Sequence, residues 1–492
     1  MNKKIAVIGA GFAGLASACS LAHKGFEVTL LEKNNQTGGR GRSFRHQGYS
    51  FDMGPSWYWM PEVFEQFFNR FGKKVSDYYT LQRLDPSYRV FFEEGMPLDV
   101  PAAYGEFKQM LEGIEPGSSP KLDQFMAEAK IKYDVSMADF VWKPSLNILE
   151  FAKPRLLIES FRLHLFSGFS SHAKKYFKHP KIIQLLEFPI LFLGAKPSKT
   201  PAMYSMMNYA DIMLGTWYPK GGMCKIAEAM TKLAQELGVR IITSSNVSAI
   251  DVTQNEAHAI SFDGKTERFD AVVAAADYHH VESKLLQKEY RSYSDEYWSN
   301  RVMSPSSLLF YIGVNRKVKG ILHHNLFFDE PFDKHAEEIY DEPAWPQKPL
   351  FYLCCTSATD PSVAPEGKEN LFILIPVATG LTSTEEQRME YLRMCLERIK
   401  KHTGEDLEAA IEYVRSYAHE EFVQDYNAFK GNAYGLANTL TQTAIMKPRL
   451  KSKKVKNLFY TGQLTVPGPG VPPSLISGQI VADEVEKYFK NR

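Results

Sequence analysis

Cysteine is scarce in this chain, and neither sign of charge is in marked excess. The five cysteines are an odd number without a CxxC motif or a Cys/His metal spacing, which argues against a disulfide scaffold and indicates reduced thiols in the cytosol. They are Cys19, Cys224, Cys354, Cys355 and Cys395. The 58 basic and 57 acidic residues leave a net charge of +1, so we expect no nucleic-acid partner.

The chain also lacks a long apolar run. Residues 459–482 form the longest uncharged stretch, but it carries four glycines and four prolines, whereas a membrane-spanning helix needs about 20 apolar residues. We expect the start of the chain to be retained and not cleaved as a leader, because cleavage there would remove the glycines described below. Neither a GxSxG elbow nor a P-loop is present. The pairs His279–His280 and His323–His324 have no carboxylate or cysteine at ligand spacing, so we predict no metal site and treat them as surface or structural histidines.

The first forty residues carry the clearest pattern in the chain. The apolar run Ile5–Ile8 is typical of a buried parallel strand, and Gly9 permits a tight turn after it. Gly11 allows the backbone to approach a pyrophosphate at the N-terminus of a helix that begins near Phe12, and Gly14 lets that helix pack on the strand. This pattern predicts a βαβ dinucleotide site.

An acidic residue closes the second predicted strand of this unit. Glu32 lies 18 residues beyond Gly14, where a carboxylate accepts hydrogen bonds from a ribose, and its charge argues against the 2′-phosphate of NADP. The following segment contains Gly39, Arg40 and Arg42, a combination suited to backbone approach and to guanidinium contacts with phosphate. Further on, Gly54-Pro55-Ser56 leads into three aromatic residues that either wall a ligand or belong to the core.

These motifs together resemble the FAD-binding start of the amine oxidase and phytoene desaturase superfamily. Asp52 to Ser56 is similar to carotenoid desaturases in particular, and the family's C-terminal signature matches Asn457 to Val471 with Ser477 six residues on. A motif from the middle of the family's chain matches Tyr218 to Met223. Gln463, Leu464 and Val466 depart from the signature, which bears on packing beside the flavin. Among desaturases the chain most resembles the flavobacterial phytoene type and the related hydroxycarotenoid 3,4-desaturases.

The resemblance implies an α/β fold: a discontinuous, Rossmann-like FAD-binding domain of the GR2 type with a sheet-plus-helix substrate domain. We expect residues 1–75, 202–285 and 448–492 to bind FAD, and residues 76–105 and 286–447 to hold the substrate. In the FAD domain, Val247 would approach the adenine, and a final helix starting at Val471 would point at the flavin. The residues expected to bind FAD are Gly9, Gly11, Phe12, Ala13, Gly14, Glu32, Lys33, Gly39, Arg40, Arg42, Gly54, Pro55, Ser56, Val247, Gly462, Gly470 and Val471.

The resemblance also implies an activity, which is desaturation of a C40 carotenoid, in the first place phytoene to lycopene. A 1-hydroxy-carotenoid 3,4-desaturase is the alternative; a carotenoid isomerase, a lipid carrier without flavin and an amine oxidase are further ones. Hydride would pass to flavin N5, and electrons then to oxygen or a quinone. No catalytic base stands out. The candidates for lining the substrate tunnel are Trp57, Tyr58, Trp59, Trp217 and Tyr218.

Residues 106–201 are expected to form a helical, basic part of the chain. Between residues 151 and 181, seven Lys or Arg residues stand against one acid, Glu159, and apolar residues alternate with them. A basic and apolar face of this kind suits the surface of an anionic bilayer, from which an insoluble hydrocarbon must be collected. We therefore expect a cytoplasmic protein that binds peripherally to the inner face of the cell membrane.

Overall fold

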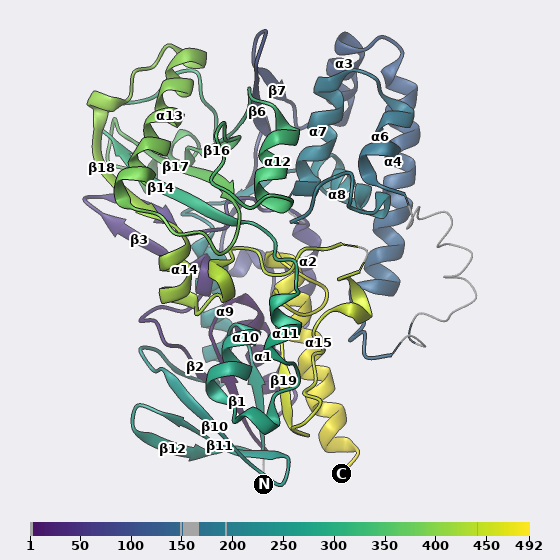
Figure 1. The fold of residues 1–492 in the computed structure, drawn as a ribbon, viewed down its shortest axis with the longest axis vertical. Helices are drawn as coiled ribbons and strands as arrows, with labels where there is room; N and C mark the ends of the chain where they lie inside the picture. The colour runs from purple at the N-terminus through teal and green to yellow at the C-terminus, as the bar shows by residue number, and fades with distance from the viewer. Residues whose placement is uncertain (1–2, 148–149, 151–166, 192–193, 440) are drawn as a thin grey trace.

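A computed structural model describes residues 3–147, 150, 167–191, 194–439 and 441–492. Its lower part in Figure 1 is built on a five-stranded sheet in which every pair of neighbouring strands is parallel. The order is β19 (Leu458–Tyr460), β13 (Ala271–Ala274), β1 (Lys4–Ile8), β2 (Glu27–Leu31) and β9 (Arg240–Ile242). Three distant stretches of the chain thus share one sheet, as the sequence predicted, and the α/β class is confirmed.

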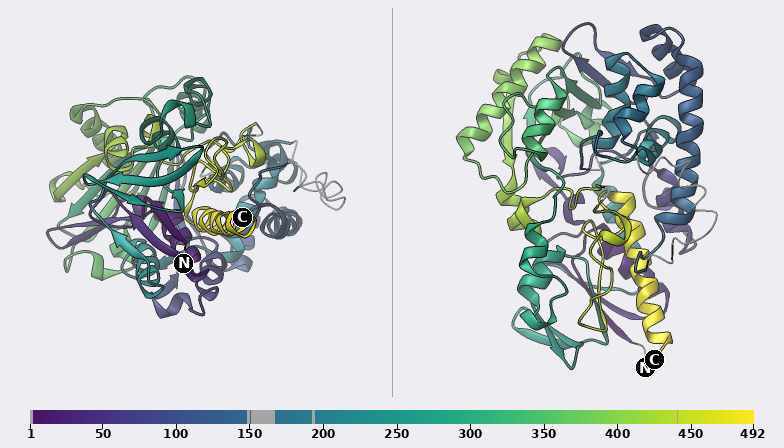
Figure 2. Two further views of the ribbon diagram at one scale, coloured as in Figure 1. Left: turned by 90° about the horizontal axis from the view of Figure 1, so that it is seen from below. Right: turned by 45° about the vertical axis from the view of Figure 1, so that its right-hand side comes forward.

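Helices with small residues cover one face of this sheet. Helix α1 (Phe12–His23) is buried along most of its length and packs against α15 (Val471–Lys490) and α9 (Cys224–Glu236). The helix α2 (Pro61–Asn69) joins the same apolar core. A three-stranded antiparallel sheet packs on the other face: β10 (Val247–Thr253), β11 (Glu256–Phe262) and β12 (Lys265–Arg268). Figure 2 shows that α15 rises from the C-terminus toward the middle of the molecule.

The upper part contains a seven-stranded mixed sheet. Its order is β18 (Ile411–Tyr417), β14 (Ser306–Val314), β17 (Glu369–Val377), β16 (Phe351–Cys354), β15 (His324–Phe328), β6 (Tyr88–Phe92) and β7 (Leu98–Val100). All nine residues of β14 are buried, because one face of the sheet packs on α13 (Glu385–Thr403) and the other packs on a second core. The apolar runs at 307–314, 350–355 and 371–378 therefore form strands as predicted.

A helical layer faces the second side of this sheet (Figure 1). It comprises α3 (Tyr104–Ile114), α4 (Ser118–Val135), α6 (Phe169–Tyr176), α7 (Pro180–Leu191) and α8 (Met206–Tyr209). Residues 151–166 of the predicted basic segment lie outside the described residues. In the part of the chain that is described, no helix combines the length and the apolar character that crossing a bilayer requires.

Shorter elements connect these layers. The pairs β3–β4 and β5–β8 are small antiparallel ladders: β3 (Ser43–His46), β4 (Tyr49–Asp52), β5 (Leu81–Arg83) and β8 (Trp217–Pro219). The other α-helices of the described residues are α10 (Tyr278–His280), α11 (Asp295–Ser299), α12 (Phe332–Tyr340) and α14 (His419–Tyr426). The domain boundaries given above stay a prediction.

Candidate functional site

A cavity of about 730 Å³ begins at the carboxyl ends of β1 and β2 and continues between the seven-stranded sheet and the helical layer. Its near end is lined by the turn after β1, by Glu32 and by Val247, and its far end by side chains of β14, β17 and α8. The carboxyl edge of a parallel sheet is where open α/β folds bind their ligands. One continuous space therefore joins a nucleotide-type site to a second compartment.

Glycines form the floor of the near end. The Gly9 amide donates to the Leu31 carbonyl (2.7 Å), and a Cβ on Gly14 would lie 1.9 Å from the Gly9 carbonyl oxygen. Gly39 has φ +55°, and a Cβ there would lie 3.0 Å from the Gly11 Cα. A side chain on Gly14 would force α1 away from the turn after β1, and a side chain on Gly39 would close the gap to Gly11 where the backbone would approach a pyrophosphate beside the N-terminus of α1.

The Glu32 carboxylate is held in place at the end of β2. One oxygen accepts a hydrogen bond from the Ala10 amide (2.8 Å), and the other accepts from the amide and side chain of Asn34 (2.8 and 2.9 Å). The residue is 4% exposed and lines the cavity. Since a carboxylate has about four acceptor sites, it can still accept a ribose hydroxyl.

Arg40 supplies a buried positive charge on the cavity wall. One guanidinium nitrogen, Nη2, donates to the Asn432 carbonyl (2.9 Å), and the group lies over the Tyr426 ring at 4.8 Å. Burial lowers the pKa of Arg40. Its Nε has no hydrogen-bond partner among the described residues, so an anionic ligand would satisfy a donor that the protein leaves open.

Arg42 was predicted to bind the same phosphate, but its side chain is directed elsewhere. Its guanidinium donates to the Gly39 carbonyl (3.2 Å) and to the Asp425 carboxylate (2.8 Å), and the residue does not line the cavity. Arg40 lies within the 3-10 turn Gly39–Gly41, whereas Arg42 follows that turn in an extended conformation, so the two side chains leave the backbone in different directions. Arg42 therefore braces the Gly39 turn.

The C-terminal loop closes the near end from the other side. Ser477 Oγ accepts hydrogen bonds from the Thr461 hydroxyl (2.9 Å) and the Gly462 amide (3.2 Å), which ties the loop to α15. Gly462, Gly470 and Val471 line the cavity together with the first turn of α15. The positive end of the helix dipole at this turn would stabilise negative charge on a bound ring.

The far end of the cavity is almost entirely apolar. Leucine, methionine and phenylalanine side chains of the sheet and the helical layer form its walls: Phe188, Met203, Met206, Met207, Leu309, Leu326, Phe328, Leu350 and Leu374. A few polar groups interrupt these walls; Tyr204, for example, bonds the Thr443 hydroxyl (3.5 Å). This compartment suits a long hydrocarbon.

The structure places the five tunnel candidates in two groups. Trp57 and Trp59 line the cavity. Tyr58 points the opposite way along the chain and bonds the Tyr79 hydroxyl (2.9 Å) in the core of the lower unit. Trp217 donates to the Leu214 carbonyl (2.8 Å), and Tyr218 donates to Asp360 (3.1 Å); neither lines the cavity. The period of two in an extended segment explains why neighbours separate.

Most of the other residues predicted to bind the cofactor line the same cavity. These are Gly9, Gly11, Phe12, Ala13, Glu32, Lys33, Gly39, Arg40, Gly54, Pro55, Ser56, Val247, Gly462, Gly470 and Val471. Gly14 lies behind the turn, where it packs on Gly9. Several polar residues of the lining escaped the sequence analysis, among them Asp277, His280 and Asn438, because isolated polar residues in loops carry no periodic pattern.

Lys447 was also not predicted from the sequence. This lysine is 3% exposed, and its Nζ has no hydrogen-bond partner among the described residues. It lies beside the C-terminal loop, where its Nζ is 3.6 Å from the position that a Cβ on Gly468 would occupy. Burial lowers the pKa of Lys447 to about 7. The folded chain therefore carries an amine that changes charge near neutrality at the edge of the cavity.

We expect Lys447→Met to raise the melting temperature, and to do so most below pH 7. Below pH 7 both folded and unfolded chains hold the proton, so the full cost of burying the charge, a few kcal/mol, is present. Between about pH 7 and 10.5 only the unfolded chain holds it, so the wild type gains stability with rising pH and the difference shrinks. Thermal unfolding of flavin-free protein from pH 6 to 10 measures this; a gain independent of pH would contradict it.

Comparison with known proteins now identifies the cofactor. Residues 12–486 match the family described as flavin containing amine oxidoreductase. The chain belongs to this family. The chain is 42% identical to the carotenoid 3,4-desaturase of Haloarcula japonica, over 98% of both chains, and 30% identical to the zeta-carotene-forming phytoene desaturase of Myxococcus xanthus, over 98% of this chain and 94% of that one.

Solved structures agree on the fold of this flavin-containing amine oxidoreductase. An oxidoreductase from Methanosarcina mazei superposes with a TM-score of 0.64 at 16% identity, covering 98% of this chain and all of that one. The protein is an FAD-dependent oxidoreductase. The glycine floor, the fixed Glu32 carboxylate and the open donor on Arg40 fit FAD: Glu32 would accept the ribose hydroxyls, and the N-terminus of α1 and Arg40 would hold the pyrophosphate.

Proposed function

We propose that this protein is a carotenoid desaturase, and that carotenoid 3,4-desaturation describes it better than the conversion of phytoene to lycopene. The observation that carries this choice is the 42% identity to a carotenoid 3,4-desaturase along 98% of the chain, against 30% to a phytoene desaturase along the same length. The apolar far end of the cavity supports a polyene substrate of either kind.

The residues of the chain would act mainly by placing the substrate and excluding water. Bound FAD accepts a hydride from carbon. The apolar walls would hold the polyene in line with the near end, and Trp57 and Trp59 would flank it at the junction of the two compartments. Because the positive charge left on the substrate is shared over the neighbouring alkene, position and dryness contribute more than a fixed counter-charge. Oxygen or a quinone would then reoxidise the flavin.

One assay separates the candidate reactions. The FAD-loaded protein is incubated in liposomes with phytoene, with lycopene or with a 1-hydroxy-carotenoid, and the products are separated and their absorption spectra recorded. We expect a product with a longer chromophore from the 1-hydroxy-carotenoid or from lycopene, and no such product from phytoene. Conversion of phytoene alone would overturn the 3,4-assignment, and an altered isomer ratio without a longer chromophore would show an isomerase.

The remaining alternatives find less support. A carrier that had lost its flavin would not need the Gly11–Gly39 approach or the unpartnered Nε of Arg40. An amine oxidase requires groups that recognise a cation, whereas the far walls are leucine, methionine and phenylalanine.

We also propose that the protein collects its substrate while bound peripherally to a membrane. Lys174 and Lys175 on α6 and Lys178 just after it are exposed, at the end of the predicted basic segment. Cationic side chains beside an apolar face attract anionic head groups, each by about 1 kcal/mol.

Replacing Lys174, Lys175 and Lys178 by glutamine removes at most about 3 kcal/mol of attraction to an anionic membrane. We therefore expect flotation of the protein with anionic liposomes to fall by roughly tenfold or more. The matched control replaces three exposed lysines of another loop, Lys453, Lys454 and Lys456, with the same change in charge. Equal flotation of both variants would show that this patch is not the attachment site.

A further inference from the structure

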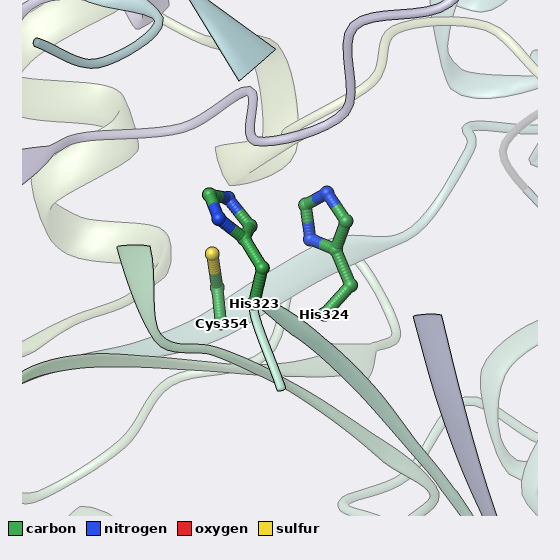
Figure 3. Close-up of side chains that lie close together, drawn as sticks. All are labelled: His323, His324 and Cys354. Carbon is green, nitrogen blue, oxygen red and sulfur yellow. The ribbon is translucent and has the colours of Figure 1, made fainter. Parts of the chain in front are cut away.

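The sheet of the upper part brings two histidines and a cysteine together behind the cavity wall. His324 is the direct partner of Cys354 in the pairing of β15 with β16, and His323 precedes β15 by one residue. Figure 3 shows the three side chains on one side of the sheet, close to one another. One imidazole nitrogen from each histidine and the Cys354 Sγ lie within 4.8 Å of each other.

This cluster is fully shielded from water. His323 is 4% exposed, His324 0% and Cys354 3%, so the surface position considered for this histidine pair is wrong, and the structural alternative stays a prediction. The Nε2 atoms of both rings have no hydrogen-bond partner among the described residues. Two buried imidazole nitrogens without partners are costly, unless another group binds there.

The rest of each ring is held in place by a hydroxyl group. His323 Nδ1 lies 2.9 Å from the Thr359 hydroxyl, and His324 Nδ1 lies 2.6 Å from the Tyr352 hydroxyl. Histidines that bind metals have this arrangement, in which an outer partner fixes the ring through its second nitrogen. The His324 ring also stacks on the Trp57 ring, with the ring centroids 4.0 Å apart, which further restricts the orientation of the imidazole.

The surrounding charges also suit a cation. The Asp360 carboxylate acts electrostatically on His323, and the Asp52 carboxylate acts on Cys354. Both are anchored, since Asp360 accepts from the Gly221 amide (2.7 Å) and Asp52 from the Met223 amide (2.7 Å). Burial and the Asp52 carboxylate raise the pKa of the Cys354 thiol, so a metal ion would have to displace its proton on binding.

We propose that His323, His324 and Cys354 bind one Zn²⁺ ion. Two imidazoles and a thiolate are typical zinc ligands, while Mg²⁺ and Ca²⁺ require oxygen. Bonds of about 2.0 to 2.3 Å require the ligand atoms to lie within about 4 Å of each other, and in the structure they lie within 4.8 Å. The ion would fix the wall that carries Trp57 and Tyr352. Sequence spacing concealed this site, because the cysteine follows the histidines by thirty residues.

The test is the metal content of the purified holoprotein. After expression with zinc supplied and removal of unbound metal, elemental analysis should find about one zinc per chain, and Cys354→Ser and His323→Gln should lose it. Cys355→Ser is the matched control, because this neighbouring buried thiol faces Ser357 and Glu369 instead. Retained flavin absorption shows that a variant is folded.

A second measurement needs no variant. Protein expressed with cobalt in place of zinc should show the visible bands of a thiolate-bound, near-tetrahedral Co²⁺ at wavelengths beyond the flavin absorption. Wild-type protein that carries neither stoichiometric zinc nor these cobalt bands would overturn the proposal, and so would zinc that persists in Cys354→Ser. Neither result bears on desaturase activity, so this proposal and the proposed function can fail separately.

Discussion

Arg40→Met is expected to abolish retention of FAD during purification. Arg40 lines the near end of the cavity, and its buried Nε has no hydrogen-bond partner among the described residues. Its guanidinium is therefore expected to bind the pyrophosphate. Removing one member of a buried, hydrogen-bonded charge pair costs about 2–5 kcal/mol, which weakens binding roughly 30-fold to several thousand-fold. Flavin absorbance per protein and titration of the stripped protein with FAD measure the loss.

Arg42→Met is the matched control for this experiment. It removes the same side chain two residues away, but Arg42 pairs with Asp425 and does not line the cavity. We expect it to lower the melting temperature modestly while affinity for FAD changes less than tenfold. If the two variants bind FAD equally well, Arg40 does not hold the phosphates, and the assignment of the near end must be revised.

The elements of the cofactor unit could be predicted because their determinants are local. Glycine spacing, a four-residue apolar run and one terminal acid specify a βαβ unit within the first forty residues, and α1 and α15 begin at the expected Phe12 and Val471. The Val471 start is marked by Gly470, with φ +112°, followed by prolines in the first turn. Such features depend on few residues, so the sequence shows them.

Which residues line the cavity could not be predicted in full, because this depends on contacts between distant parts of the chain. Trp57, Tyr58 and Trp59 are consecutive, yet only the outer two face the cavity. Tyr218 belongs to a family motif, but its hydroxyl bonds Asp360, a residue 142 positions away. The burial of Lys447 and the proximity of Cys354 to two histidines result from the folding together of distant segments. Burial and pairing across the chain, not residue type, decide these roles.

Gly478→Ala is expected to destabilise the protein and weaken its hold on FAD, although only one methyl group is added. Gly478 lies where α15 crosses α1, and a Cβ there would be 2.4 Å from the Ala13 carbonyl oxygen, 2.7 Å from the Ala16 Cβ and 2.8 Å from the Ser17 amide nitrogen. None of these atoms can rotate away, so the two helices must separate, at a cost of about 1–3 kcal/mol or more. The first turns of both helices line the cofactor end of the cavity, so their separation also disturbs that site.

The same substitution in another helix should have the opposite effect. Gly113, in α3, is exposed, and nothing lies within 4 Å of its missing Cβ. Gly113→Ala should therefore stabilise the helix by up to about 1 kcal/mol, because alanine loses less backbone entropy on folding. Melting temperature and flavin content of the two variants are measured together. A lower melting temperature and less flavin in Gly478→Ala alone would show that the α1–α15 contact couples folding to cofactor binding, whereas similar values in both would contradict it.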